Sequence, residues 1–174
     1  MADRRVLTTA PRGLDWKAAI TAGLVAGALF LLLEMILVPV AGMGSAWGPP
    51  RMIAAIVLGS DVLPPPATFN LGIFLVALVV HLLLSVVYAL VLAAIVRGMT
   101  MGAAVVAGLA FGLALYLVNF YLFTALFPWF AMARNWVSVL AHLAFGGVAA
   151  YAYKATLGAR TRAPGIGRPA PVGP

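Results

Sequence analysis

The chain has 174 residues, of which 64% are hydrophobic and only 9% charged, with no cysteine and a formal net charge of +7. A soluble domain carries about 25% charged residues, so this composition excludes an ordinary soluble enzyme or nucleic-acid-binding domain. It also excludes a disordered chain, which is poor in apolar side chains, and a disulfide-bonded or cysteine-ligated fold. The composition therefore indicates a small integral membrane protein.

Four apolar stretches have the length needed to cross a bilayer, because about 20 residues of helix span its hydrocarbon. These stretches are 18–40, 71–96, 103–127 and 136–153. Since lipid offers no partners to backbone amides, the spans are expected to be helices. The expected fold class is all-α, an integral membrane four-helix bundle. Residues 1–17 are expected to form a cytoplasmic arm, and residues 154–174, which become rich in proline and glycine, a disordered basic cytoplasmic tail.

The loop 41–70 between the first and second spans contains a further apolar segment. Pro49 and Pro50 suit the start of a helix and Gly59 its end. A helix of this length reaches only about 16 Å, which is too short to cross the bilayer. We therefore expect a short helix, within about 45–60, that lies on the outer face or dips into it. It is either a packed cap over the bundle or a lid or docking surface.

Lysine and arginine are distributed unequally between the two sides. Nine belong to the termini and the turn after the second span: Arg4, Arg5, Arg12, Lys17, Arg97, Lys154, Arg160, Arg162 and Arg168. Only Arg51 and Arg134 lie on the other side. Because cytoplasmic loops are enriched in these residues, we predict a multi-pass bacterial inner-membrane protein with both termini cytoplasmic. The net positive charge is then explained by this bias and by attraction to anionic lipid headgroups. No nucleic-acid partner is expected.

An internal repeat is predicted by a shift of 85 residues, which aligns the first span with the third and superimposes their paired glycines. The second and fourth spans correspond more weakly, through His81 and His142. Equivalent spans run in the same direction, so the repeat is a parallel one, with two hairpins around a pseudo-two-fold axis along the membrane normal. Small residues spaced by four let helices approach closely in lipid. The glycines predicted to pack helices are Gly23, Gly27, Gly108, Gly112 and Gly146.

A strongly polar side chain occurs in every span. These are Glu34, His81, Asn119 and His142. At about 1.5 Å of rise per residue, all four fall in the outer half of the bilayer, within one or two turns of each other. Polar groups at this depth face the bundle interior and need partners. Ser85 and Tyr88 extend the His81 face. Glu34 could pair with either histidine, or with Arg51 if the loop folds inward.

Several uses of this polar cluster are open. The first possible use is a hydrogen-bonded clamp between the hairpins. The second is a proton-, quinone- or ion-binding site, such as a small transporter needs. The third is a b-type haem site with His81 and His142 as axial ligands. No resident cofactor is predicted, nor a metal, since structural zinc normally has four ligands and no cysteine is available. The sequence contains no nucleophile, phosphate-loop or metalloprotease motif. We therefore expect a non-enzymatic structural or accessory protein that binds itself or another membrane subunit through its small-residue stripes.

At these positions the chain resembles a loose group of small, uncharacterised bacterial inner-membrane proteins with four spans. The motifs that carry the resemblance are Gly23-x-x-x-Gly27, His81 with Tyr88, Gly108 with Gly112, and His142 before Gly146. The segment 47–56 also resembles proteins labelled as sodium:proline symporters. The resemblance covers about residues 18–153 and implies the four-span fold without an established activity.

Overall fold

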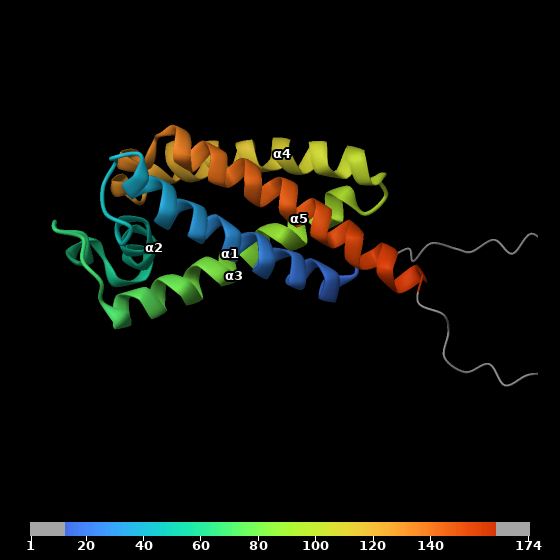
Figure 1. Cartoon of the computed structure of the whole chain (residues 1–174), viewed down its shortest axis with the longest axis horizontal. Coiled ribbons are helices and arrows are strands. Elements are labelled where there is room, and N and C mark those ends of the chain that lie inside the picture. The colour runs from blue at the N-terminus through green and yellow to red at the C-terminus, as the bar shows by residue number, and fades with distance from the viewer. Residues whose placement is uncertain (1–12, 163–174) are drawn as a thin grey trace, which may run out of the picture.

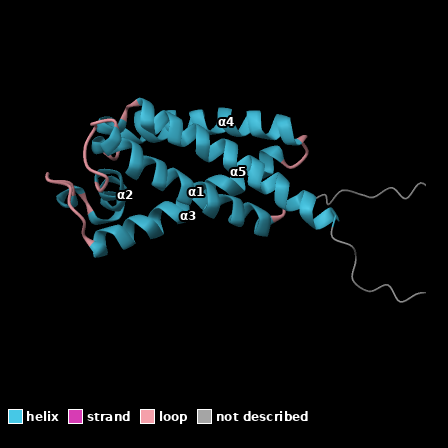
Figure 2. Cartoon of the chain, viewed as in Figure 1, coloured by secondary structure: helices cyan, strands magenta, loops and turns pink. Residues whose placement is uncertain are grey.

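The computed structural model describes residues 13–162, with side chains to residue 159 (Figure 1). Its α-helices are α1 (Trp16–Val40), α2 (Gly48–Leu58), α3 (Leu71–Val96), α4 (Met101–Leu117) and α5 (Trp136–Arg162). This part of the chain contains no strand, which confirms the all-α class (Figure 2).

Four segments are long and apolar enough to cross a membrane: α1, α3, Met101–Ala125, which contains α4, and Trp136–Ala159 within α5. The chain is therefore a membrane-embedded helical protein. The bounds of α3 coincide with the predicted second span, and α1 begins slightly earlier than residue 18, at Trp16. The short helix expected in the first loop is present as α2.

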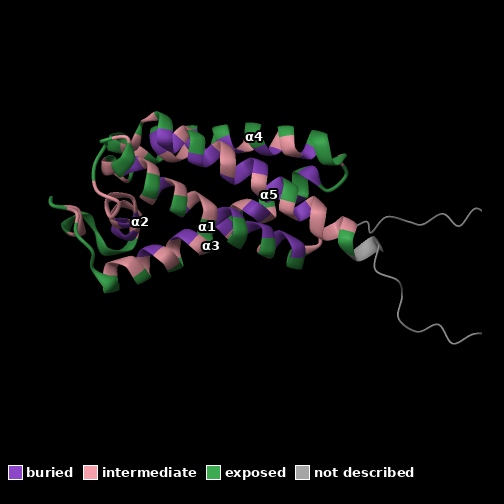
Figure 3. Cartoon of the chain, viewed as in Figure 1, coloured by how far each residue is buried: buried purple, intermediate pink, exposed green. Residues whose placement is uncertain are grey.

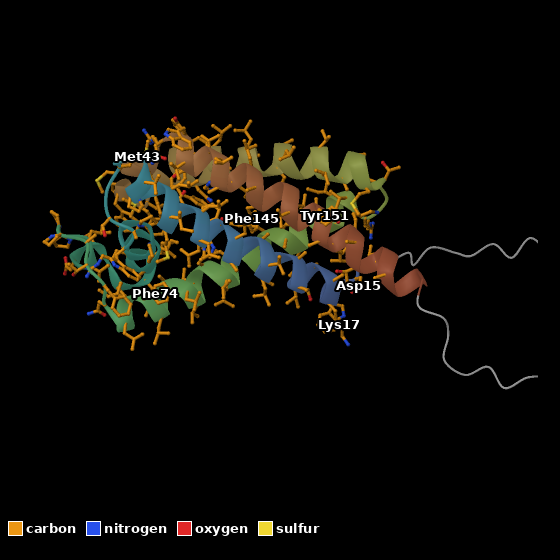
Figure 4. The ribbon with its side chains drawn as sticks, in the orientation of Figure 1. Asp15, Lys17, Met43, Phe74, Phe145 and Tyr151 are labelled. Carbon is orange, nitrogen blue, oxygen red and sulfur yellow. The ribbon has the colours of Figure 1, made fainter. Side chains whose placement is uncertain are left out.

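The helices form a layered bundle in which α1 and α5 lie in the middle. Helix α3 packs mainly on α1 and α4 mainly on α5, so α3 and α4 lie on opposite sides and make few contacts with each other (Figure 1). Both ends of the described chain lie at one end of the bundle, together with the turn between α3 and α4. Helix α2 lies at the opposite end, and Figure 4 shows Met43 and Phe74 there, with Asp15 and Lys17 at the first end.

Side-chain caps define where the long helices begin. Asp15 accepts from the Ala18 backbone amide at 2.9 Å, and Asn70 accepts from the Ile73 amide at 3.0 Å. Thr100 caps α4 and Asn135 caps α5 in the same way. These side chains satisfy amides in the first turn that have no partner within the helix, so polar residues at the ends of apolar runs set the helix starts.

The core changes in character along the bundle axis. Near the end that holds the chain ends, alanines of α1 and α5 are almost completely buried and let these two helices approach closely; they include Ala18, Ala22, Ala26, Ala149 and Ala150. Buried residues line the facing sides of the helices (Figure 3). Toward α2 the side chains that face inward are larger and polar or aromatic, and they surround a cavity.

Two predicted spans differ from their observed form. The α-helix expected to continue to residue 127 ends at Leu117 and is followed by a π-helical turn, Val118–Leu122, and a 3₁₀ turn, Phe123–Ala125. Arg134 Nε donates to the Phe120 carbonyl at 2.6 Å and so stabilises this irregular end. Helix α5 continues past residue 153 to Arg162, because no proline interrupts it there. The rest of the expected tail and most of the expected arm lie outside the described residues.

Candidate functional site

A cavity of about 270 Å³ lies inside the bundle at the end where α2 packs. It is lined by residues of α1, α2, α3, α4, the π-helical turn and α5. The structure thus brings together at one cavity all four side chains of the predicted polar cluster, together with Ser85 and Tyr88. Most of the remaining wall is apolar, and it includes six phenylalanines: Phe30, Phe120, Phe123, Phe127, Phe130 and Phe145. Phe145 lies near the middle of the bundle (Figure 4).

His142, Asn119 and Tyr88 form a chain of hydrogen bonds across three segments. His142 Nδ1 lies 2.7 Å from the Ser138 carbonyl, which only accepts, so Nδ1 carries the hydrogen. His142 Nε2 is then the acceptor for Asn119 Nδ2, at 3.2 Å. This assignment orients the amide, whose Oδ1 accepts from the Tyr88 hydroxyl at 3.2 Å. The chain joins α3, the π-helical turn and α5.

His81 makes a separate link within the first hairpin. Its Nε2 donates to the Gly27 carbonyl of α1 at 2.8 Å, which leaves Nδ1 of the neutral ring as an acceptor. The Phe30 ring packs against both imidazoles, with centroid distances of 5.2 Å to His81 and 4.8 Å to His142. Axial ligation of one haem by both histidines would therefore require breaking the bond between His142 and Asn119 and displacing Phe30.

Glu34 differs from the other members of the cluster because its carboxyl lacks a complete set of partners. The side chain is only 5% exposed, and its Oε1 has no hydrogen-bond partner. The Ser138 hydroxyl of α5 interacts with this carboxyl, but neither Glu34 Oε1 nor Ser138 Oγ has a partner in full hydrogen-bonding geometry. Both residues line the cavity. An ionised or polar group left in this state is costly to bury, so the pair is available to a ligand in the cavity.

The arginines near this end of the bundle are used elsewhere. Arg51 does not form the expected pair with Glu34, because its Nε donates to the Thr68 carbonyl at 3.0 Å and its Nη1 to the Val62 carbonyl at 2.7 Å. These bonds hold the segment that follows α2. Arg134 donates to Phe120 and to the Thr124 hydroxyl. Neither arginine is among the residues that line the cavity.

The predicted packing glycines lie at the contacts within each hairpin. A Cβ on Gly23 would lie 2.8 Å from the Ser85 carbonyl oxygen of α3, and one on Gly27 would meet the Ser85 side chain. In the other hairpin, Gly108 packs against the backbone of Gly146 and Gly112 against that of His142. The Ser85 hydroxyl itself is satisfied by the His81 carbonyl of its own helix, at 2.8 Å. Every glycine of the predicted stripes is therefore used inside the chain.

The cavity is covered on one side and reaches the surface on another. Helix α2 contributes Met52, Ile53 and Ile56 to its wall, and Trp129 Nε1 donates to the Met52 carbonyl at 3.1 Å, which ties α2 to the 3₁₀ segment Pro128–Ala133. Leu84 of α3 and Phe123 after α4 line the cavity and are 38% and 36% exposed, respectively. Met43 and Met132 also line the cavity and are 42% and 68% exposed, so the cavity reaches the surface at more than one place.

Sequence reasoning missed two residues that shape the site. Ser138 lies one helical turn before His142, and Phe30 lies one turn before Glu34. Residues four apart share a helix face, so this spacing was the signal that pointed to both. The predicted span 103–127 included Phe120, Phe123 and Phe127, and Phe130 lay beyond it; all four line the cavity. The irregular turns after α4 that place them there have no evident local signature.

Within residues 13–162, no three histidine or carboxylate side chains come together as a metal site requires. Comparisons with protein-family models, with curated proteins and with solved structures found nothing similar to this chain.

Proposed function

We propose that this chain is a non-enzymatic inner-membrane protein that binds a small molecule in the cavity between its spans. Glu34 contacts the ligand, whereas His81, Asn119 and His142 hold the helices in register. The observation that carries the proposal is the contrast between Glu34, buried in the cavity wall with an unpartnered oxygen, and these three residues, which all have partners.

A purely structural role accounts for only part of the cluster. Hydrogen bonds to His81 and through Asn119 connect helices, as a clamp must. A carboxyl group at bilayer depth costs at least several kcal/mol to bury. The Glu34 carboxyl has only the poorly placed Ser138 hydroxyl of α5 beside it. Residues that lower stability persist at sites where they serve function. Glu34 therefore favours a binding site over a clamp alone.

The proposed topology places both termini in the cytoplasm. Lys154 Nζ donates to the Arg97 carbonyl at 3.2 Å, so these basic residues share one end of the bundle. Arg51 and Arg134 lie toward the other end, near α2 and the cavity. Because lysine and arginine are enriched in cytoplasmic loops, the end with more basic residues is the cytoplasmic one. Helix α2 lies at the opposite end and therefore covers the cavity from the outer face.

We further propose that the hairpins α1–α3 and α4–α5 are related as a repeat. Gly23 packs against Ser85 and Ala89, and Gly108 packs against Gly146 and Ala150, which are equivalent positions when His81 is aligned with His142. The contacts between hairpins are unequal, since α1 packs closely on α5 whereas their counterparts α4 and α3 scarcely touch. In this proposal, the open α3–α4 pair is what makes room for the cavity.

An accessory role, as a homo-oligomer or with another membrane subunit, is the alternative proposal. The glycine stripes that suggested it are buried inside the chain's own hairpins. A partner would therefore have to bind a different, lipid-facing surface.

The stability of two variants tests the proposal without knowledge of the ligand. Glu34→Met removes the unpartnered carboxyl at similar volume and is expected to leave the free energy of unfolding unchanged or to raise it by about 1–3 kcal/mol. Asn119→Ala breaks the link to His142 and is expected to lower it. Unfolding by SDS in mixed micelles, followed by circular dichroism, measures both. If Glu34→Met lowers stability as much as Asn119→Ala does, Glu34 belongs to the clamp and the proposal fails.

A further inference from the structure

We infer that the cavity binds a hydrophobic ammonium cation, with the charged nitrogen against Glu34 and Ser138 and the apolar part among the phenylalanines. This inference rests on the proposed function and specifies the chemical class of its ligand. It follows from three properties of the wall: its charge, its balance of hydrogen-bond donors and acceptors, and its aromatic content.

The first property is the charge of the wall. Glu34 is the only residue with a formal charge among those that line the cavity, which include no lysine, arginine or aspartate. Arg51 and Arg134 are held by backbone carbonyls outside it. An ionised carboxylate in a membrane interior needs a positive partner. With both histidines neutral, as their hydrogen bonds assign them, the lining residues supply none. A bound cation would complete the pair with an ionised Glu34.

The second property is the set of hydrogen-bonding atoms that the protein leaves free in the wall. The hydroxyl donors of Tyr88 and Ser85 are already used on protein acceptors, and so is one N–H of each histidine. The acceptors left over are Glu34 Oε1, Ser138 Oγ and the lone pair of His81 Nδ1. The donors left over are the Ser45 hydroxyl and N–H groups of Asn119 and Asn135, which also line the cavity. A ligand with N–H donors suits the acceptors beside Glu34.

The third property is the aromatic wall. Six phenylalanines line the cavity, and Phe30 lies one helical turn from Glu34 on α1. Aromatic faces attract cations through the ring quadrupole, and more strongly where water is excluded. Phenyl rings also provide the apolar surface that an organic cation buries. The exposed lining residues, which include Leu84, Phe123 and Met132, give such a molecule access to the cavity.

Binding of matched probes to the full chain in lipid nanodiscs tests the inference. The probes are 2-phenylethylammonium, the neutral donor 2-phenylethanol, the neutral hydrocarbon propylbenzene, and decylubiquinone, each titrated calorimetrically against protein and against empty nanodiscs. We expect saturable binding of the ammonium at least about tenfold tighter than that of the alcohol or the hydrocarbon. Glu34→Gln should remove this preference. Asp61→Asn, which changes an exposed carboxylate outside the cavity, should retain it.

The outcomes separate the ligand class from the proposed function. Equal binding of the ammonium and the alcohol, or a preference that survives Glu34→Gln, overturns the cation inference but leaves a ligand-binding cavity. Saturable binding of decylubiquinone alone does the same. If none of the four probes binds more than it binds to empty nanodiscs, the proposed function fails as well. The probe series on the unchanged protein decides the inference even if Glu34→Gln does not fold.

Discussion

Replacement of Gly23 by alanine is the sharpest test of how the first hairpin packs. An alanine Cβ at this position would lie 2.8 Å from the Ser85 carbonyl oxygen and 2.9 Å from both Val86 Cα and Ala89 Cβ. Two of these atoms belong to the backbone, so rotation of a side chain does not relieve the overlap. Helices α1 and α3 must instead separate by about half an ångström to restore ordinary contact.

The expected cost is the difference between two effects. Overpacking in a well-packed interface costs about 1–3 kcal/mol. Alanine is favoured over glycine inside a helix by up to about 1 kcal/mol, which offsets part of this cost. We therefore expect Gly23→Ala to lower the free energy of unfolding by about 1–2 kcal/mol.

The matched control is Gly102→Ala, because Gly102 lies in α4 and a Cβ at this position would meet no atom of another segment within 4 Å. It should be neutral or slightly stabilising. Both variants are measured by SDS titration in mixed micelles with circular dichroism. If Gly23→Ala proves as stable as Gly102→Ala, α1 and α3 do not pack as described. Gly108→Ala, which meets the Gly146 backbone, should be destabilising in the same way if the hairpins are equivalent.

Three further predictions concern polar contacts. Asn119→Ala removes hydrogen bonds to both Tyr88 and His142, whereas Tyr88→Phe removes a single hydrogen bond, which contributes about 0.6 kcal/mol. Asn119→Ala should therefore lower the free energy of unfolding more than Tyr88→Phe does. Equal losses in SDS titration would contradict the chain of bonds. Arg51→Ala frees the carbonyls of Val62 and Thr68 and should speed amide hydrogen exchange at Leu63, whose amide donates to Ser60, while leaving α3 unchanged. An unchanged rate at Leu63 would show that the arginine does not hold this segment. Asp15→Ala removes the cap of α1 and should cost about 1 kcal/mol, with faster exchange confined to the first turn; an unaltered first turn would argue against the cap.

The sequence by itself determined the class of protein and the positions of its helices. The signals that determined them are local: the length of each apolar stretch, the polar residues that cap the helices, and the prolines and glycine at the ends of α2. They were therefore readable without knowledge of the fold, as the bounds of α3 and the presence of α2 illustrate. The convergence of Glu34, His81, Asn119 and His142 on one cavity also followed from their heights along the spans.

Only the tertiary structure decided how the four polar residues differ. Whether a buried group finds a partner depends on the rotation and separation of helices, and these are set by packing between distant segments. That packing pairs His81 with Gly27 and His142 with Asn119, and leaves Glu34 Oε1 without a partner. The same long-range contacts close α1 against α5 and leave α3 with few contacts to α4.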